Sequence, residues 1–364
     1  MDGMPSHDLT HLDDAVADLR AASLSSRTIA EYEKQWRGVQ SWCQVMDVRS
    51  LPMSSQDLAR HLAAVADDYS VSTLAQRVAA INAAHRIAGL PAPGNDPMVS
   101  QVLAGLRHRR RAVPRRRAKA LSLEHVRVLV SSLDQQTVTW PDAVAAHRDT
   151  ALVLLGWTAA LRRSEIVDLD WRHLSVERSA GSVHLRVRID YSKTDQHGDG
   201  DTLAIPSGSH RLTCTPCAMH RWAHLVRTTS RPEAMSAVWD ARSSSRAADA
   251  HRCGLSDESW AQATNGLDGP VFRSVTASGA ISDRRLAGSS VGSILVRRAE
   301  QAGLSTTKLS AHSLRAGFIT EADASGADLA AIMRQSRHRR PETVLGYIRH
   351  SNPLAGNAVT SLDL

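Results

Sequence analysis

A strongly basic segment with a proline at its centre divides this chain. Residues 107–119 (RHRRRAVPRRRAK) contain eight Lys and Arg and no acid, and Pro114 lies in the middle. A helix interior does not tolerate proline, and the hydrophobic periodicity changes on either side of this segment. At 364 residues the chain is long enough for about two domains. We therefore predict a linker between two domains, each with its own core.

The positive charge of the chain is concentrated in this linker. Of the 44 Lys and Arg, eight lie there, which leaves 36 against 37 Asp and Glu in the rest. Almost all are Arg, the side chain suited to bidentate phosphate contacts. Such a cluster is either simply solvated or binds a polyanion with release of counterions. The candidate polyanion-binding residues are Arg107, Arg109, Arg110, Arg111, Arg115, Arg116, Arg117 and Lys119.

The part before the linker has the periodicity of amphipathic helices. Apolar residues such as Ile29, Trp36 and Val39 recur on one helical face. Helices are expected at 26–46, 55–67, 72–88 and 96–105, and the strand signal is almost absent. We predict an all-helical first domain.

The part after the linker mixes helices with a little strand. Helices are expected at 122–133, 143–161, 218–227, 290–301, 312–326, 328–335 and 341–348. Alternating apolar residues at 182–191 and 202–205, on either side of a polar turn, predict a β-hairpin. Residues 228–266 have weak periodicity and indicate a long excursion. The predicted fold class is mainly α with a small β-hairpin or sheet, an α+β domain after an all-α domain.

Several classes of protein are disfavoured. No stretch approaches the roughly 20 apolar residues of a membrane span, and the N-terminus is acidic where a secretory signal would be basic. A cytoplasmic protein is expected. Four cysteines, unevenly spaced, do not suggest a disulfide framework. No P-loop or dinucleotide-binding glycine pattern is present, so nucleotide chemistry is not indicated.

The second domain contains a series of polar residues in suggestive contexts. Each has an ordinary explanation when taken alone. For Arg162 it is a salt bridge to Glu165 or Asp168. For Lys193 it is a solvated position at a hairpin tip, and for Tyr347 it is packing by the aromatic ring. His312 and Arg315 are three residues apart and therefore share a helical face. The candidates, in chain order, are Arg162, Lys193, His312, Arg315, His338 and Tyr347.

Taken in order, these segments resemble the tyrosine recombinases, also called phage-type integrases. The matching motifs are ALRRSEIVDLDW, the hairpin lysine in SKTDQHGDG, and SAHSLRAGF. Tyr347 in TVLGYIRH and His338, nine residues before Tyr347, complete the match. The resemblance covers about residues 20–350. It implies a tail at 1–20, a helical (SAM-like) core-binding domain at 21–106, the linker at 107–119, a catalytic domain at 120–350 and a tail at 351–364.

The resemblance implies a DNA strand-exchange enzyme with a role for each candidate. Tyr347 would attack a phosphodiester and form a covalent 3′-phosphotyrosyl link, with no metal or ATP and no cofactor. His312 would accept the phenol proton and Lys193 would protonate the leaving oxygen. Arg162 and Arg315 would stabilise charge on the phosphate, and His338 would hydrogen-bond it or orient the site.

The resemblance also implies partners. The substrate would be double-stranded DNA with paired recombination sites, contacted in part by the basic linker. The enzyme would be a homo-tetramer when synapsed and a monomer or weak dimer when free, located at the nucleoid. Accessory DNA-bending or directionality proteins are conceivable partners.

Two positions depart from the family, which commonly has glycine at both. Ala160 precedes the first arginine motif, where alanine is nearly neutral in a helix. Arg337 precedes His338, and a residue with a Cβ does not take positive φ cheaply, so this turn is expected to be altered or strained.

Three alternatives remain open. The chain could be a type IB topoisomerase, which relaxes DNA without paired sites, or a DNA-binding relative without catalysis. Cys214-Thr-Pro-Cys217, with His210, His220 and His224 nearby, has zinc-like spacing. Without a second Cys-x-x-Cys, we predict no metal site.

Overall fold

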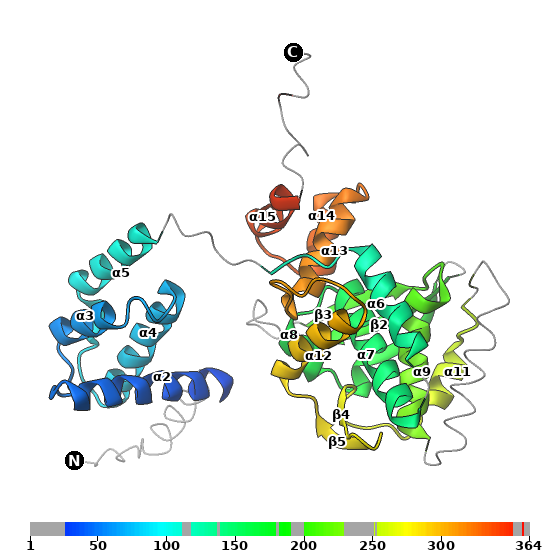
Figure 1. Ribbon diagram of the computed structural model, residues 1–364, viewed down its shortest axis with the longest axis horizontal. Coiled ribbons are helices and arrows are strands. Elements are labelled where there is room, and N and C mark those ends of the chain that lie inside the picture. Colours follow the sequence, from blue (N-terminus) through cyan, green and yellow to red (C-terminus); the bar gives the residue numbers. More distant parts are fainter. Residues whose placement is uncertain are drawn as a thin grey trace, which may run out of the picture. The chain divides into compact units, whose positions relative to one another are not determined.

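The computed structural model describes residues 26–110, 118–136, 139–179, 182–190, 200–228, 251, 253–351 and 359. The chain forms two compact units, Met1–Arg115 and Arg116–Leu364 (Figure 1). Each is described below by itself.

The first unit is helical throughout its described residues, as predicted. It consists of α2 (Ser26–Val45), α3 (Ser55–Ala64), α4 (Val71–Ile87), the short 3-10 helix η1 (Pro93–Asn95) and α5 (Pro97–Arg109). Ser54, Ser70 and Asp96 cap α3, α4 and α5 through their side chains, so the unpaired N–H groups of these helix starts find acceptors. The core contains Val39, Leu58, Leu62, Leu74, Ile81, Val99 and Leu103.

The second unit is built around one buried helix. This helix, α7 (Trp140–Thr158), is buried along most of its length and packs against α6 (Leu123–Gln135), α9 (Thr215–Arg227) and α13 (His312–Ala324). Gly317 of α13 lies against the backbone at Leu121, where a Cβ would collide with the Leu121 carbonyl oxygen. The close approach of α13 to the start of the unit therefore depends on a glycine.

A three-stranded antiparallel sheet packs beside these helices. Its strands are β1 (Leu174–Ser179), β2 (Ser182–Ile189) and β3 (Asp201–Pro206), in the order β1-β2-β3. Val183, Leu185, Val187 and Ile189 alternate inward along β2 and contribute to the core. The predicted hairpin is the pair β2 and β3. A smaller pair, β4 (Arg273–Val275) and β5 (Ile281–Arg285), forms a separate hairpin.

The remaining helices complete the second unit. They are α8 (Arg163–Asp168), α11 (Asp257–Thr264), α12 (Gly288–Gln301), α14 (Leu329–Ser336) and α15 (Pro341–Ser351), with the 3-10 helices η2 (Trp171–His173) and η3 (Arg211–Thr213). Figure 1 shows α14 and α15 together with α13 at one end of this unit. These three helices share a small apolar cluster of Ile319, Ile332, Val344 and Ile348, and Tyr347 packs against it.

The predicted fold class is confirmed: the described chain is mainly helical with small antiparallel sheets. β1 and the pair β4–β5 were not predicted. The helix α7 ends at Thr158 and not at Leu161 as predicted, and α5 continues to Arg109 beyond the predicted end at Gly105. Within the described residues, no helix combines the length and the apolar character needed to span a bilayer.

Candidate active site

Arg162, the first candidate arginine, lies just after the end of α7. After Thr158 the chain turns through Ala160, which has φ 47°, a left-handed conformation. The N–H of Leu161 donates to Gly156 O at 3.0 Å and the N–H of Ala160 donates to Trp157 O at 3.0 Å, the two bonds of a Schellman motif. Arg162, two residues after Ala160, occupies the N-cap position of α8. The expectation that Ala160 is helical is therefore wrong: it is the left-handed residue of the helix end.

His338 lies just after the end of α14, in a turn of the same kind. Arg337 has φ 54° and ψ 43°, and the N–H of His338 donates to Met333 O at 3.2 Å while that of Arg337 donates to Arg334 O. This is again a Schellman motif with a non-glycine residue in the left-handed position. The prediction of strain before His338 is borne out in the backbone: Arg337 adopts the positive φ that a Cβ disfavours.

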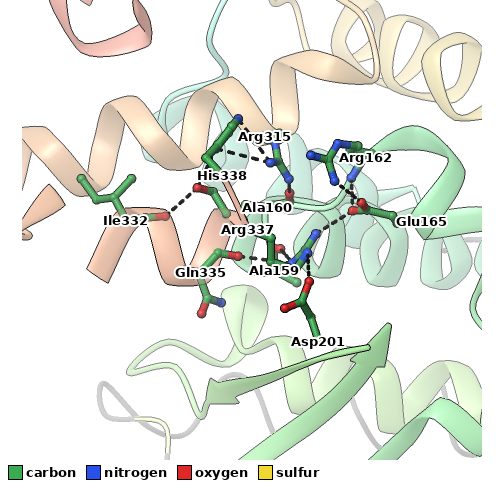
Figure 2. Close-up of polar contacts among 11 residues, drawn as sticks. Ala159, Ala160, Arg162, Glu165, Asp201, Arg315, Ile332, Gln335, Arg337 and His338 are labelled. Carbon is green, nitrogen blue, oxygen red and sulfur yellow. Dashed lines mark hydrogen bonds and ion pairs between the residues drawn. The ribbon is translucent and has the colours of Figure 1, made fainter. Parts of the chain in front are cut away.

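The buried side chain of Arg337 makes several polar contacts at this turn (Figure 2). Its Nη2 donates to Glu165 Oε2 at 2.6 Å, and its Nη1 donates to Ala159 O at 3.1 Å. Glu165 in turn accepts from Arg162 Nη1 at 2.5 Å and from the Arg162 backbone N–H at 2.8 Å. Burial opposes ionisation of Glu165, but the charges of Arg337 and Arg162 outweigh it and lower the pKa of this carboxyl. Glu165 is therefore an anion shared by two guanidinium groups.

Arg315 lies beside this group and is almost completely buried. Its Nη1 donates to Ala160 O at 2.6 Å, and its Nη2 lies 3.3 Å from both ring nitrogens of His338 (Figure 2). Burial and the nearby Arg162 charge lower the pKa of Arg315 to about 9. The guanidinium remains protonated at neutral pH and is fixed by the carbonyl that the left-handed Ala160 presents.

The tautomer of His338 follows from its partners. Ser336 Oγ donates its single proton to Ile332 O at 2.6 Å, so it accepts from His338 Nδ1, which is 2.8 Å away. Burial, with the charges of Arg315 and Arg162, lowers the pKa of His338 to about 3. His338 is therefore neutral in the DNA-free protein, with its proton on Nδ1.

His312 and Tyr347 are in direct contact. His312 Nε2 lies 2.6 Å from the Tyr347 hydroxyl oxygen, although 35 residues separate them in sequence. Burial, then the charges of Arg315 and Arg162, lower the pKa of His312, so its ring is neutral at neutral pH. With the proton on Nδ1, Nε2 accepts a hydrogen bond from the Tyr347 hydroxyl. The rings of His338 and Tyr347 also lie near one another, with centroids 6.0 Å apart.

The structure thus places five of the six candidates close to one another: Arg162, His312, Arg315, His338 and Tyr347. Lys193 lies outside the described residues. Glu165 was considered only as a salt-bridge partner of Arg162, and the structure contains that salt bridge. Its second cation, Arg337, could not be anticipated because 172 residues separate the two.

The linker candidates are described only in part. Arg107 and Arg109 are exposed in the last turn of α5, and Lys119 is exposed at the start of the second unit. Arg110 is different, because its guanidinium donates to the carbonyl oxygens of Tyr69 and Ala66. Arg111, Arg115, Arg116 and Arg117 lie outside the described residues.

Comparisons with known proteins find similarity in sequence and in fold. No protein-family model matches the sequence. A curated protein described as an integrase/recombinase xerD homolog, from Selenomonas ruminantium, is 27% identical over 343 residues, which cover 93% of this chain and 86% of that protein.

Solved structures share the fold. The Tn1549 transposon integrase in complex with circular intermediate DNA superposes with a TM-score of 0.50 at 15% identity, over 96% of this chain and 98% of that one. A Y379F form of the same integrase, in complex with transposon right end DNA, gives a TM-score of 0.50 at 13% identity over the same shares. The chain is thus similar in sequence, along most of its length, to a protein described as an integrase/recombinase, and it shares the fold of a solved transposon integrase.

Proposed function

We propose that this protein is a site-specific DNA recombinase that cleaves and rejoins strands through a covalent 3′-phosphotyrosyl intermediate. The observation that carries the proposal is the 2.6 Å contact between the Tyr347 hydroxyl and His312 Nε2, with Arg315 and His338 next to it. The integrase/recombinase from Selenomonas ruminantium supports it, because the similarity extends over 93% of this chain.

Tyr347 and His312 form the nucleophile and its base in this proposal. The Tyr347 oxygen attacks the phosphorus, a P–O bond forms to the phenol, and the bond to the 5′-oxygen breaks. An ordinary phenol has a pKa of about 10 and needs a proton acceptor at neutral pH. His312 serves because its lowered pKa keeps the ring neutral, and in the tautomer with the proton on Nδ1 its Nε2, 2.6 Å from the hydroxyl oxygen, accepts the phenol proton.

Arg162 and Arg315 stabilise the negative charge that develops on the non-bridging oxygens. Both are held before DNA arrives, Arg162 by Glu165 and Arg315 by Ala160 O. Prepositioned cations cost little reorganisation when the charge appears, which is why they lower a barrier efficiently. An incoming phosphate also favours the protonated form of His338, and its Nε2 then becomes a donor to the phosphate.

Lys193 is proposed as the acid that protonates the departing 5′-oxygen. The residue lies outside the described residues, and its assignment depends on the motif in the hairpin between β2 and β3. Reversal of the chemistry by a 5′-hydroxyl of another strand rejoins the DNA, because the phosphotyrosyl bond conserves the energy of the broken bond.

Assembly and location belong to the same proposal. Exchange of two duplexes needs four cleavages, so a chain with one nucleophile acts as a homo-tetramer on paired sites. The first unit is proposed as the core-binding domain and the second as the catalytic domain, with the basic linker between them in contact with DNA. The protein would act in the cytoplasm, at the nucleoid.

A nicked suicide substrate tests the proposal. The protein's own binding site is first selected from random duplexes, and a nick beside the scissile phosphate then lets the cleaved end diffuse away. Wild type should form a covalent complex that survives denaturing gels. Tyr347→Phe should bind with unchanged affinity and form none, whereas the matched control Tyr69→Phe in the first unit should behave as wild type.

Variants of the cationic residues extend this test. Arg162→Ala, Arg315→Ala and Lys193→Ala should each slow cleavage by about 10²–10³, the usual effect of removing one charge-stabilising donor. Relaxation of supercoiled plasmid without a cognate site would favour a topoisomerase instead. Specific binding with no covalent complex from wild type would indicate a catalytically silent relative.

A further inference from the structure

A cluster of four metal-ligating side chains lies away from the candidate active site. Its sulfur and nitrogen atoms all lie within 4.8 Å of one another. We call it the Cys3His cluster: Cys214, Cys217, His251 and Cys253. Cys214 caps α9 and Cys217 lies in its first turn, whereas the other two precede α11. The sequence analysis predicted no metal site here, and the three histidines that it noted near the Cys-x-x-Cys pair, His210, His220 and His224, do not belong to the cluster.

The separations within the cluster suit a tetrahedral ion. Cys217 Sγ lies 3.3 Å from His251 Nε2 and 3.3 Å from Cys253 Sγ. Around a zinc ion with Zn–S of about 2.3 Å and Zn–N of about 2.0 Å, ligand atoms are roughly 3.5–3.8 Å apart. The two sulfurs are much further apart than the roughly 2.05 Å of a disulfide. Small shifts of these side chains would complete the geometry.

The backbone around the cluster also suits a bound thiolate. The N–H of Gly208, two residues after β3, donates to Cys214 Sγ at 3.4 Å. The backbone N–H of His251 donates to Ser209 O at 3.2 Å, which holds the segment before α11 against the same turn. Gly208 approaches Cys214 so closely that an added Cβ would be 3.2 Å from its Cα. The turn 207–209 therefore wraps the cluster tightly.

The charges near the cluster fit three thiolates and a divalent cation, which together carry one net negative charge. Arg221 lies one helical turn beyond Cys217 on α9, and its positive charge interacts favourably with Cys217 and Cys214. His220 lies between Cys217 and Arg221 in sequence. Its Nε2 is 3.2 Å from Ser259 O, so its ring takes part in the packing of α9 against α11.

We propose that the Cys3His cluster is a structural zinc site. Four protein ligands close the coordination sphere, so no position remains for water or substrate, as is typical of structural rather than catalytic zinc. The ion would join the start of α9 to the segment before α11 across 36 residues of chain. It would thereby fix the turn after β3 without taking part in strand cleavage, which the proposed function assigns to other residues.

The direct test is the metal content of the purified full-length protein. The protein is prepared without chelator, with zinc in the medium and with any affinity tag removed, and analysed by inductively coupled plasma mass spectrometry. We expect one zinc ion per chain, resistant to dialysis. Replacement by Co²⁺ should give the visible d–d bands and the sulfur-to-metal charge transfer of a tetrahedral thiolate site.

Matched variants locate the site. His251→Asn and Cys253→Ser should lose the zinc and lower the Tm, because metal binding is coupled to folding of this part of the unit. His210→Asn, the exposed histidine near the cluster, and Cys43→Ser in the first unit should retain one zinc per chain. Tyr347→Phe should also retain it, so metal content reports on this site whether or not the chain is a recombinase.

Other outcomes would overturn the proposal. Wild-type protein that folds cooperatively, takes up no zinc or cobalt and retains four titratable thiols would show an ordinary packed thiol cluster. A Cys217–Cys253 disulfide found by non-reducing peptide mapping of the native protein would also contradict it. Zinc that persists in both His251→Asn and Cys253→Ser would place the metal elsewhere.

Discussion

Arg337 Nη2 lies 2.6 Å from Glu165 Oε2, and both side chains are only 3% exposed. Through Glu165 this contact connects the turn before His338 to Arg162, whose Nη1 lies 2.5 Å from the other carboxylate oxygen. A residue that is unfavourable for its backbone conformation therefore supplies the charge that keeps Glu165 ionised and Arg162 in place. At the position where the resemblance to tyrosine recombinases leads one to expect glycine, this chain has a side chain that reaches Glu165.

The first prediction concerns this pair. Arg337→Gly relieves the left-handed strain but leaves Glu165 with one cation fewer, and breaking a buried pair costs about 3–5 kcal/mol. Because the relief is only about 1–2 kcal/mol, the variant should be less stable than wild type in urea unfolding. Glu165→Gln together with Arg337→Gly should recover part of the loss. An Arg337→Gly protein at least as stable as wild type would show that the ion pair does not compensate for the backbone.

The second prediction concerns the other left-handed turn. Ala160→Gly should raise the free energy of unfolding slightly, by about 1 kcal/mol at most, because the gain at φ 47° exceeds the extra flexibility of glycine in the unfolded chain. The matched control is Ala159→Gly, next to it at φ −87°, which should destabilise because no strain is relieved there. Equal effects of the two substitutions would contradict the role assigned to the turn.

Sequence predicted most helices of both units because their apolar residues recur with helical periodicity. It missed β4 and β5 because strands of 3 and 5 residues carry too few positions for alternation to show. Ala160 was placed in a helix because it belongs to the long, largely apolar stretch 143–161. The helix end is revealed only by the bonds to Trp157 O and Gly156 O.

The candidate site was predicted residue by residue, but its supporting contacts were not. Motif order nominated Arg162, His312, Arg315, His338 and Tyr347, which the structure brings together. Glu165 contacts Arg337, which is 172 residues away in sequence. Cys217 contacts His251, which is 34 residues away. Local pattern carries no information on such pairs, since tertiary packing decides them.

The third prediction separates two kinds of arginine near the linker. Arg107→Gln and Arg109→Gln remove exposed charges, and each should flatten the plot of log affinity for DNA against log salt by about 0.9 if it contacts a phosphate. Arg110→Gln should instead lower the stability of the first unit, because its guanidinium donates to the Tyr69 and Ala66 carbonyls. A salt slope unchanged in all three variants would leave DNA contact to other residues.

The fourth prediction is the pH dependence of cleavage. Burial and two nearby arginines lower the pKa of His312, so the ring stays neutral and able to accept a proton at lower pH than an ordinary histidine. The single-turnover cleavage rate should hold from pH 8 to about 6.5 and fall only below that, as His312 becomes protonated. A rate that already declines between pH 8 and 7 would argue against His312 as the base.

Stability over the same pH range is the control for this profile. His338 has its pKa lowered to about 3 and His61 to about 4, so both bind protons more readily in the unfolded chain. The contribution of these two neutral rings to the free energy of unfolding is complete above about pH 6.5. It is lost as the pH falls towards the lowered pKa values, at no more than about 1.4 kcal/mol per pH unit for each group. The rate should therefore be compared only where the Tm stays constant.

The most direct measurement is the identity of the residue that becomes attached to DNA. The covalent complex trapped on the suicide substrate is digested with nuclease and protease, and the peptide that retains a nucleotide is sequenced by mass spectrometry. The account predicts a 3′-phosphoryl adduct on Tyr347, in the peptide that contains TVLGYIR. An adduct on another residue, such as Tyr191, or the absence of any adduct from a protein that cleaves its site, would contradict it.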